Sequence, residues 1–206
     1  MISVAKMQAL EKEAGEKGIT TLQLMENAGA NCAKILDEEN PLKNKNIIVF
    51  CGTGNNGGDG FCFARHAKSL GAEVSVFLVK KSSEIRTDDA KRNFKIIKNY
   101  GLEIFEEKIP EHIFQKADII VDALLGTGAK GAPKEPYKSA IDKINSSDAF
   151  TMSIDVPSGV DADTGERLGV AVKPNLTICL HDIKTGLKED VCGKMRIAPL
   201  GLLHDC

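Results

Sequence analysis

The sequence has no tryptophan, only two tyrosines and almost no net charge, and these shortages exclude one class of protein. Among 206 residues, 27 basic side chains stand against 29 acidic ones, which leaves a formal charge of −2. A nucleic-acid-binding domain usually carries a basic face, and single-stranded bases need aromatic side chains on which to stack. We therefore expect no nucleic-acid partner.

Long apolar runs and paired cysteines are missing as well. The longest apolar runs are as short as a strand, whereas a membrane-spanning helix needs about 20 apolar residues. The first residues do not form a charged segment followed by an apolar one, so they do not read as a signal peptide. The cysteines contain no C-x-x-C pair, which favours buried or free reduced thiols; they are Cys32, Cys51, Cys62, Cys179, Cys192 and Cys206. We expect a cytoplasmic protein without membrane contact.

Strand and helix patterns alternate along most of the chain. Apolar residues at three- and four-residue spacing predict two N-terminal helices, at 3–17 and 20–39. The later pattern predicts strands at 47–52, 73–79, 102–106, 118–124, 149–155 and 175–180, and helices at 57–70, 88–100, 110–116 and 136–146. The strands are apolar without clean alternation, as in a sheet covered on both faces. This pattern predicts one α/β domain over 1–206, a three-layer α/β/α sandwich with a mostly parallel sheet and extra N-terminal helices.

The most informative stretch is 51–61, which reads CGTGNNGGDGF and joins a predicted strand to a predicted helix. A glycine-rich turn there lets backbone N–H groups at the helix start face an anion. The G-x-G-x-x-G spacing fits a dinucleotide fingerprint, but that pattern alone is a weak signal. Asn55, Asn56 and Asp59 add two amides and a carboxylate that a phosphate cradle does not need. These groups could hold a cation, a ribose or a reacting atom.

Two further polar clusters follow predicted strands, DALLGTG at 122–128 and DVPSGVD at 155–161. Ligands of open α/β sheets bind outside the carboxyl ends of the strands. The three clusters therefore predict one site at that edge of the sheet. Each cluster alone could equally be a turn or a helix cap.

The clusters contain candidates for cation binding and for proton transfer. Asn56, Asp122 and Ser158 form an oxygen-rich, low-charge set that suits a monovalent cation at least as well as Mg²⁺ or Ca²⁺, and suits zinc poorly. A hydrogen-bonded cluster without a metal fits the same spacing. Asp155 is the best candidate for acid/base work, because a carboxyl at the end of a buried strand can hold a proton near neutrality. The alternative is a structural aspartate that binds neighbouring amides.

Other enzyme classes fit the sequence poorly. Ser158 has no G-x-S-x-G context, and no lysine stands where a phosphate-binding P-loop needs one. The histidines at 66, 112, 181 and 204 form no metal-spaced pair, and His181-Asp182 is a weak dyad. A Rossmann dehydrogenase would place an acidic residue at the end of its second strand, where this sequence has Lys80-Lys81. The fold is therefore expected to be Rossmann-like without the usual dinucleotide site.

Taken together, the motifs resemble those of the YjeF N-terminal domains, the NAD(P)H-hydrate epimerases. The segments that carry the resemblance are MENAG at 25–29, NNGGDG at 55–60, DALLGTG at 122–128, IDVPSG at 154–159 and KTGL at 184–187. They cover nearly the whole chain in order. The resemblance implies an isomerase of nicotinamide nucleotide repair, which interconverts the R and S epimers of hydrated NADH and NADPH.

The resemblance also implies residue roles and partners. It implies a catalytic role for Asp155 and one potassium ion per subunit, held by Asn56, Asp122 and Ser158. The implied substrate contacts are Asn55, Asn56, Gly57, Gly58, Asp59, Gly126, Thr127, Gly128, Ala129, Lys130, Gly131, Ala132 and Asp155. It further implies a homodimer and a functional partner, NAD(P)H-hydrate dehydratase, with no dehydratase domain fused to this chain.

Two departures from the family pattern put local substrate contacts in question. Ile183 stands where a proline often precedes the late lysine, and Lys134 stands where we would expect an arginine. The alternative function is a non-catalytic scaffold of the same fold that binds a nucleotide or a protein. Thermal stability in potassium against sodium, and with NADP-type ligands, discriminates between the two readings.

Overall fold

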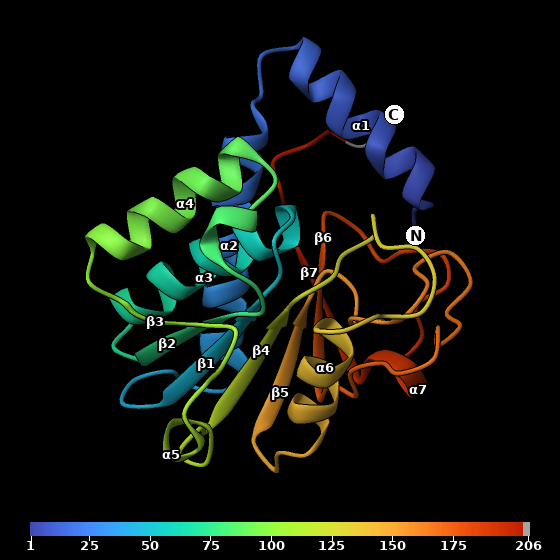
Figure 1. Cartoon of the computed structure of the whole chain (residues 1–206). Helices are drawn as coiled ribbons and strands as arrows, with labels where there is room; N and C mark the ends of the chain where they lie inside the picture. Colours follow the sequence, from blue (N-terminus) through green and yellow to red (C-terminus); the bar gives the residue numbers. More distant parts are fainter. Residues whose placement is uncertain (204–206) are drawn as a thin grey trace.

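Seven parallel strands form one sheet in the computed structural model, which describes residues 1–203 (Figure 1). The strands are β1 Asn46–Cys51, β2 Glu73–Leu78, β3 Glu103–Glu106, β4 Ile119–Ala123, β5 Phe150–Ile154, β6 Leu176–Leu180 and β7 Lys194–Ala198. They lie in the order β3-β2-β1-β4-β5-β6-β7. The chain moves outward from β1 to β3 and then returns to the other side of β1. The order therefore reverses between β1 and β4, where open α/β sheets form their ligand crevice.

Helices cover both faces of this sheet. They are α1 Val4–Glu16, α2 Thr21–Glu39, α3 Asn55–Ser69, α4 Asp88–Asn99, α5 Glu111–Phe114, α6 Tyr137–Asn145 and α7 Glu189–Cys192, with a 3₁₀ turn at Ser82–Glu84. Apolar residues of α2, α3 and α4 pack on one face of the sheet, and those of α5 and α6 pack on the other. The predicted three-layer α/β/α sandwich is thereby confirmed.

Local sequence explains where the two long N-terminal helices begin. Ser3 caps α1, since its hydroxyl accepts the Lys6 N–H. Thr20 and Gln23 form a capping box at the start of α2, in which each side chain bonds the other's backbone N–H at 3.2 and 2.8 Å. The apolar face of α2 that the three- and four-residue spacing predicted is the buried face, and it includes Met25.

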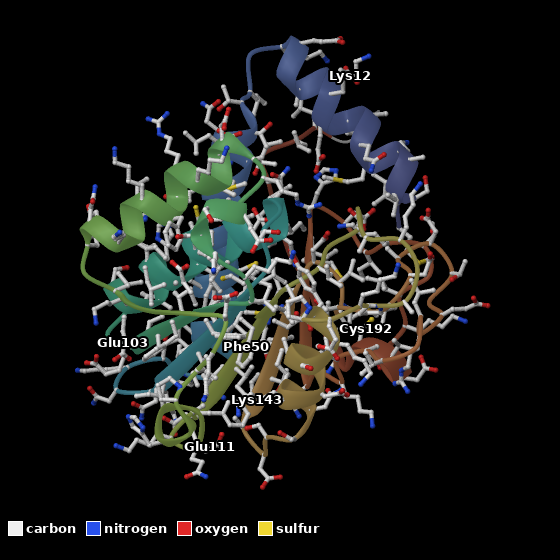
Figure 2. The ribbon with its side chains drawn as sticks, viewed as in Figure 1. Lys12, Phe50, Glu103, Glu111, Lys143 and Cys192 are labelled. Atoms are coloured by element: carbon white, nitrogen blue, oxygen red, sulfur yellow. The ribbon has the colours of Figure 1, made fainter. Side chains whose placement is uncertain are left out.

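Aromatic rings pack in the layer between the sheet and α6, where Figure 2 labels Phe50 and Lys143. Phe50 packs edge-on against Phe77 with ring centroids 5.0 Å apart and contacts Phe114 at 6.3 Å. Lys143 of α6 lies 4.0 Å from the centroid of the Phe114 ring, at the margin of this layer. These contacts hold α5 and α6 against the half of the sheet that carries the glycine-rich turn.

The structure adds one strand that the sequence reading missed. The segment of β7 alternates charged and apolar residues. This pattern is typical of an edge strand, whereas the predicted strands are apolar throughout, as in a sheet covered on both faces. Its charged residues reach back to α2, where Glu39 accepts from Lys194 Nζ at 2.6 Å and from Arg196. The predicted helix at 110–116 is a single turn, and α3 begins two residues earlier than predicted.

The N-terminal helix α1 stands apart from the others, beyond the carboxyl tips of the strands (Figure 1). The segment before it is tied to the loop after β6, because Ile2 donates to the Ile183 carbonyl at 2.8 Å and accepts from Thr185 N–H at 3.1 Å. Met7 of α1 is buried in the main core. The helix is thus held over the edge of the sheet where the polar clusters were predicted to meet.

The described part of the chain also bears on membrane-spanning helices and on the state of the cysteines. Within residues 1–203, no helix is long and apolar enough to cross a membrane. The five cysteines in this part are buried free thiols, as the spacing predicted. Cys206 and His204 lie outside the described residues.

Candidate active site

The glycine-rich turn brings the start of α3 against the end of β1. Gly54 is the N-cap of α3 and offers no side-chain hydrogen bond to the first N–H groups. A Cβ on Gly57 would lie 2.0 Å from the carbonyl oxygen of Gly52, so only glycine fits there. Asn55 and Asn56 therefore lie in the first turn of α3, not in a loop before it. An uncapped helix start at a strand end suits an anionic ligand.

Asp122 joins the loops that follow β4 and β5. Its carboxylate is fully buried, and Oδ1 accepts the Ser158 hydroxyl at 2.6 Å and the Leu124 N–H at 3.2 Å. Oδ2 accepts the Ser153 hydroxyl at 2.8 Å and the Ser158 N–H at 2.9 Å. Burial raises the pKa of Asp122, while these neutral donors lower it. Among residues 1–203 no basic side chain pairs with this carboxylate, so a bound cation would compensate its charge.

Asn56 lies beside the same two loops. A Cβ on Gly126 would come within 3.3 Å of Asn56 Cγ, and the preceding Leu125 donates its N–H to Ser158 Oγ at 2.9 Å. Asn56, Asp122 and Ser158 are thus gathered in one cluster. Within the described residues, the buried Asn56 Nδ2 has no hydrogen-bond partner. Turned over, the amide would place its oxygen at this position, and an oxygen-ligated cation fits the donor set.

The set does not resemble a zinc centre. Nowhere in residues 1–203 do three or more His, Cys, Asp and Glu side chains gather closely enough to hold a metal ion. A carboxylate with an amide and a hydroxyl is the oxygen chemistry of hard cations.

Asp155 follows β5 directly and faces a buried lysine. Its backbone has φ 70°, a left-handed conformation that aspartate adopts more readily than most residues. Lys184 Nζ donates to Asp155 Oδ1 and, at 2.8 Å, to the Leu180 carbonyl. The Leu180 N–H also donates to Asp155 Oδ1, at 3.3 Å. The Asp155 carboxylate is therefore held in one place by an ion pair and a backbone bond.

Two more carboxyl groups interact electrostatically with this pair. Burial raises the pKa of Asp59 well above its usual value, and the charges of Asp155 and Glu11 raise it further. The pKa of Glu11 on α1 is raised by partial desolvation and then by the charge of Asp155, although Glu11 is an exposed residue. Lys184 opposes both shifts. The charges of three carboxyl groups and one ammonium thus influence one another at this edge of the sheet.

Sequence reasoning missed Glu11 and assigned no role to Lys184. Glu11 carries no sequence signal, because only the position of α1 brings it to the site. For Lys184 the signal was the KTGL motif, whose lysine side chain is fully buried.

The predicted substrate loop 126–132 is only partly built into the site. Gly126 packs beside Asn56, and the Ala129 N–H closes a turn onto the Gly126 carbonyl at 3.1 Å. From Gly128 to Ala132 the loop is exposed and has neither helix nor strand. These residues remain predicted substrate contacts.

Two of the described histidines lie in helices, and the third, His181, follows Leu180 at the carboxyl end of β6. His66 is near the end of α3, where its ring contacts Glu26 at 2.8 Å. His112 belongs to α5, and His181 is buried directly after β6. Asp182 accepts the Ile183 N–H at 2.7 Å. Two surface depressions include none of the predicted site residues. One is lined by Asp118 and Phe150 among others, and the other by Phe77 and Pro136 among others.

Fold and site together define a class of protein, the Rossmann-like α/β proteins with a ligand site at one edge of the sheet. The site combines an uncapped helix N-terminus that suits an anion, an oxygen-rich cluster and a buried aspartate–lysine ion pair. The model of the family described as YjeF-related protein N-terminus matches residues 21–186. The chain belongs to this family. The matched segment contains every cluster named above except Glu11, which lies on α1.

Curated relatives and a solved structure agree with this assignment. A protein of Archaeoglobus fulgidus named bifunctional NAD(P)H-hydrate repair enzyme Nnr is 40% identical over 98% of this chain, which spans 41% of that relative's length. A protein of Nitrosopumilus maritimus named NAD(P)H-hydrate epimerase is 36% identical over 98% of this chain and 95% of its own length. The crystal structure of the yeast protein ynu0 has a TM-score of 0.83 and 28% identity, covering 93% of this chain and 85% of that one.

Proposed function

We propose that the protein is an NAD(P)H-hydrate epimerase, an isomerase that interconverts the R and S epimers of hydrated NADH and NADPH. The observation that carries the proposal is the Nitrosopumilus relative of that name, which this chain matches along 95% of its length. The uncapped start of α3 and the carboxyl groups at the same sheet edge support it, since the substrate has both a pyrophosphate and a reacting hydroxyl.

The proposed reaction needs proton transfer at oxygen. The hydrated ring carbon carries a hydroxyl and is bonded to the ring nitrogen. It can lose its configuration through ring opening or through loss of the hydroxyl to an iminium-like cation, and either route needs an acid and a base. Asp155 is the proposed catalytic residue. Lys184 holds its carboxylate in place, which fits the positioning that such transfer requires.

The substrate contacts are proposed along the turn and the two loops. The N–H groups of Asn55, Asn56 and Gly57 face the pyrophosphate, with the α3 dipole favouring its charge. The loop 126–132, exposed beyond Gly126, closes over the other side of the ligand.

We propose one potassium ion per subunit, held by Asn56, Asp122 and Ser158. The orphaned Asn56 amide and the buried Asp122 carboxylate without a basic partner support this assignment within residues 1–203. When bound, the ion would supply positive charge that neutralises Asp122 and fixes the loops around the substrate. The cation test compares melting temperature in potassium and in sodium, where a higher value in potassium that Asp122→Asn abolishes is expected. Equal values in both salts would remove the ion from the proposal.

A dehydratase is the proposed functional partner. The Archaeoglobus relative is named as bifunctional, and this chain spans 41% of it, so a second activity outside the matched part fits the name. We also propose a cytoplasmic homodimer, which sedimentation tests directly. A sedimentation profile with only monomer would remove the dimer.

The function is tested by an epimerisation assay. Purified protein with potassium receives the R-hydrate of NADPH together with a dehydratase specific for the S form. Recovery of NADPH faster than the spontaneous rate, and its loss in Asp155→Asn, is expected. A folded protein that is stabilised by NADP⁺ but does not accelerate recovery would instead be the non-catalytic scaffold.

A further inference from the structure

The carboxyl groups at the site outnumber the charges that can balance them. Lys184 is the ammonium among them, and it donates hydrogen bonds to Asp155 and to the Leu180 carbonyl. Asp59 keeps only 9% of its surface exposed, and no hydrogen bond to its carboxyl is found among residues 1–203. A buried carboxyl without a partner is expensive as an anion. It is favourable as a neutral acid beside a ligand that accepts its proton.

The position of Asp59 is fixed by its two neighbours in α3. A Cβ on Gly58 would lie 2.5 Å from Met25 Sδ of α2, and a Cβ on Gly60 would lie 2.6 Å from Ala123 Cβ of β4. The backbone at Asp59 is therefore wedged between a helix and the sheet. This packing fixes the point at which the Asp59 side chain leaves α3.

We propose that Asp59 is the general acid of the reaction and that Asp155, held by Lys184, is its general base. This assignment rests on the proposed epimerase function. It gives the two aspartates different tasks, because both are buried but only Asp155 is paired with an ammonium.

The charges around Asp59 favour its protonated form. Burial is the largest cause of its raised pKa, Asp155 and Glu11 follow, and only Lys184 acts in the opposite direction. The thiols that face it from α2, β1 and α3 also have raised pKa values and stay uncharged at neutral pH; they are Cys32, Cys51 and Cys62.

The resulting steps conserve atoms and electrons. The Asp59 carboxyl gives its proton to the hydroxyl on the hydrated carbon, the C–O bond breaks with its electron pair on oxygen, and water leaves. The iminium-like carbon then accepts water on its opposite face. Asp155 takes the proton released by that water, and the proton returns to Asp59 through solvent. No oxidant or reductant is needed, and the substrate differs from the product only in configuration.

The first test is Asp59→Asn, which keeps the shape and neutrality of the protonated acid but cannot give its proton. We expect kcat for the R-hydrate of NADPH to fall by about 100-fold or more. We expect KM and the rise in melting temperature with NADP⁺ to stay within about threefold and about one degree of wild type. A variant that retains a third of wild-type kcat, or one that loses KM alone, overturns the assignment.

The second test uses the pH profile of kcat and needs no change at Asp59. Glu11→Gln removes an anion that raises the pKa of Asp59, so the alkaline limb of the profile moves to lower pH. Glu16→Gln on the same helix is the matched control, because Glu16 lies in the exposed last turn and pairs only loosely with Lys12, at 3.9 Å. An unmoved limb in Glu11→Gln overturns the assignment. A wild-type protein that does not epimerise overturns it together with the proposed function, a failure that is visible before any variant is made.

Discussion

Replacing Lys184 with methionine tests the buried ion pair that holds Asp155. The Lys184 side chain is 0% exposed and that of Asp155 is 12% exposed, so water compensates neither charge well once the partner is gone. Removing one member of a buried pair typically costs 3–5 kcal/mol. Asp155 would keep a little solvent and the Leu180 N–H bond. We therefore expect Lys184→Met to lower the free energy of unfolding by about 3 kcal/mol, at the lower end of that range.

A double-mutant cycle isolates the interaction free energy between Asp155 and Lys184 from the effects of the two single changes. Asp155→Asn retains a residue that tolerates the left-handed backbone at φ 70° and leaves the enclosed ammonium with neutral acceptors only. We expect this variant to lose about 4 kcal/mol, more than Lys184→Met, because the lysine is the more deeply buried partner. Removing both charges should cost less than the two single changes together, with a coupling of about 2–3 kcal/mol.

Urea unfolding at neutral pH measures these free energies by linear extrapolation. Lys138→Met is the matched control, since its ion pair with Asp142 at 2.8 Å is about half exposed on both sides. It should cost less than about 0.5 kcal/mol. The reasoning is refuted if Lys184→Met costs no more than the control, or if the two single changes add without coupling.

Three further predictions concern packing, hydrogen bonding and pH. Gly57→Ala forces a Cβ to within 2.0 Å of a backbone carbonyl oxygen and should lower the free energy of unfolding by about 2 kcal/mol or more. Gly15→Ala in α1, where a Cβ would meet nothing within 4 Å, should raise that free energy by about 0.5–1 kcal/mol. Urea unfolding that ranks the two variants the other way contradicts the packing. Ser158→Ala removes a 2.6 Å bond to the buried Asp122 carboxylate and should cost about 1–3 kcal/mol by the same measurement, a loss below 0.5 kcal/mol being the contrary result. Because the pKa of Asp59 is raised in the folded state, the native protein binds more protons than the unfolded chain, so this residue lowers stability as the pH rises from its ordinary value of 3.8 through the folded value. Asp59→Asn should therefore gain stability relative to wild type as the pH rises above 3.8, and a difference that stays constant above this pH would contradict the sign.

The elements and the edge that carries the site could be predicted from sequence. Strand and helix periods are local properties of the chain, and the carboxyl ends of parallel strands meet at one edge whatever the loops do. The clusters around Asn56, Asp122 and Ser158 were therefore expected together, and the hydrogen bonds between Asp122 and Ser158 join the two loops in the structure.

The charge balance of the site was decided only by tertiary structure. Asp155 and Lys184 are 29 residues apart, and no spacing rule predicts that their side chains meet in the interior. Glu11 comes near the site because the backbone hydrogen bonds of Ile2 to the loop after β6 hold α1 over the strand ends. Burial and charge–charge interaction depend on distances through space, whereas the sequence reports only order along the chain. The residue types and their place at the strand ends were thus determined by the sequence. Which buried carboxyl is paired with the lysine was determined by the packing of distant segments.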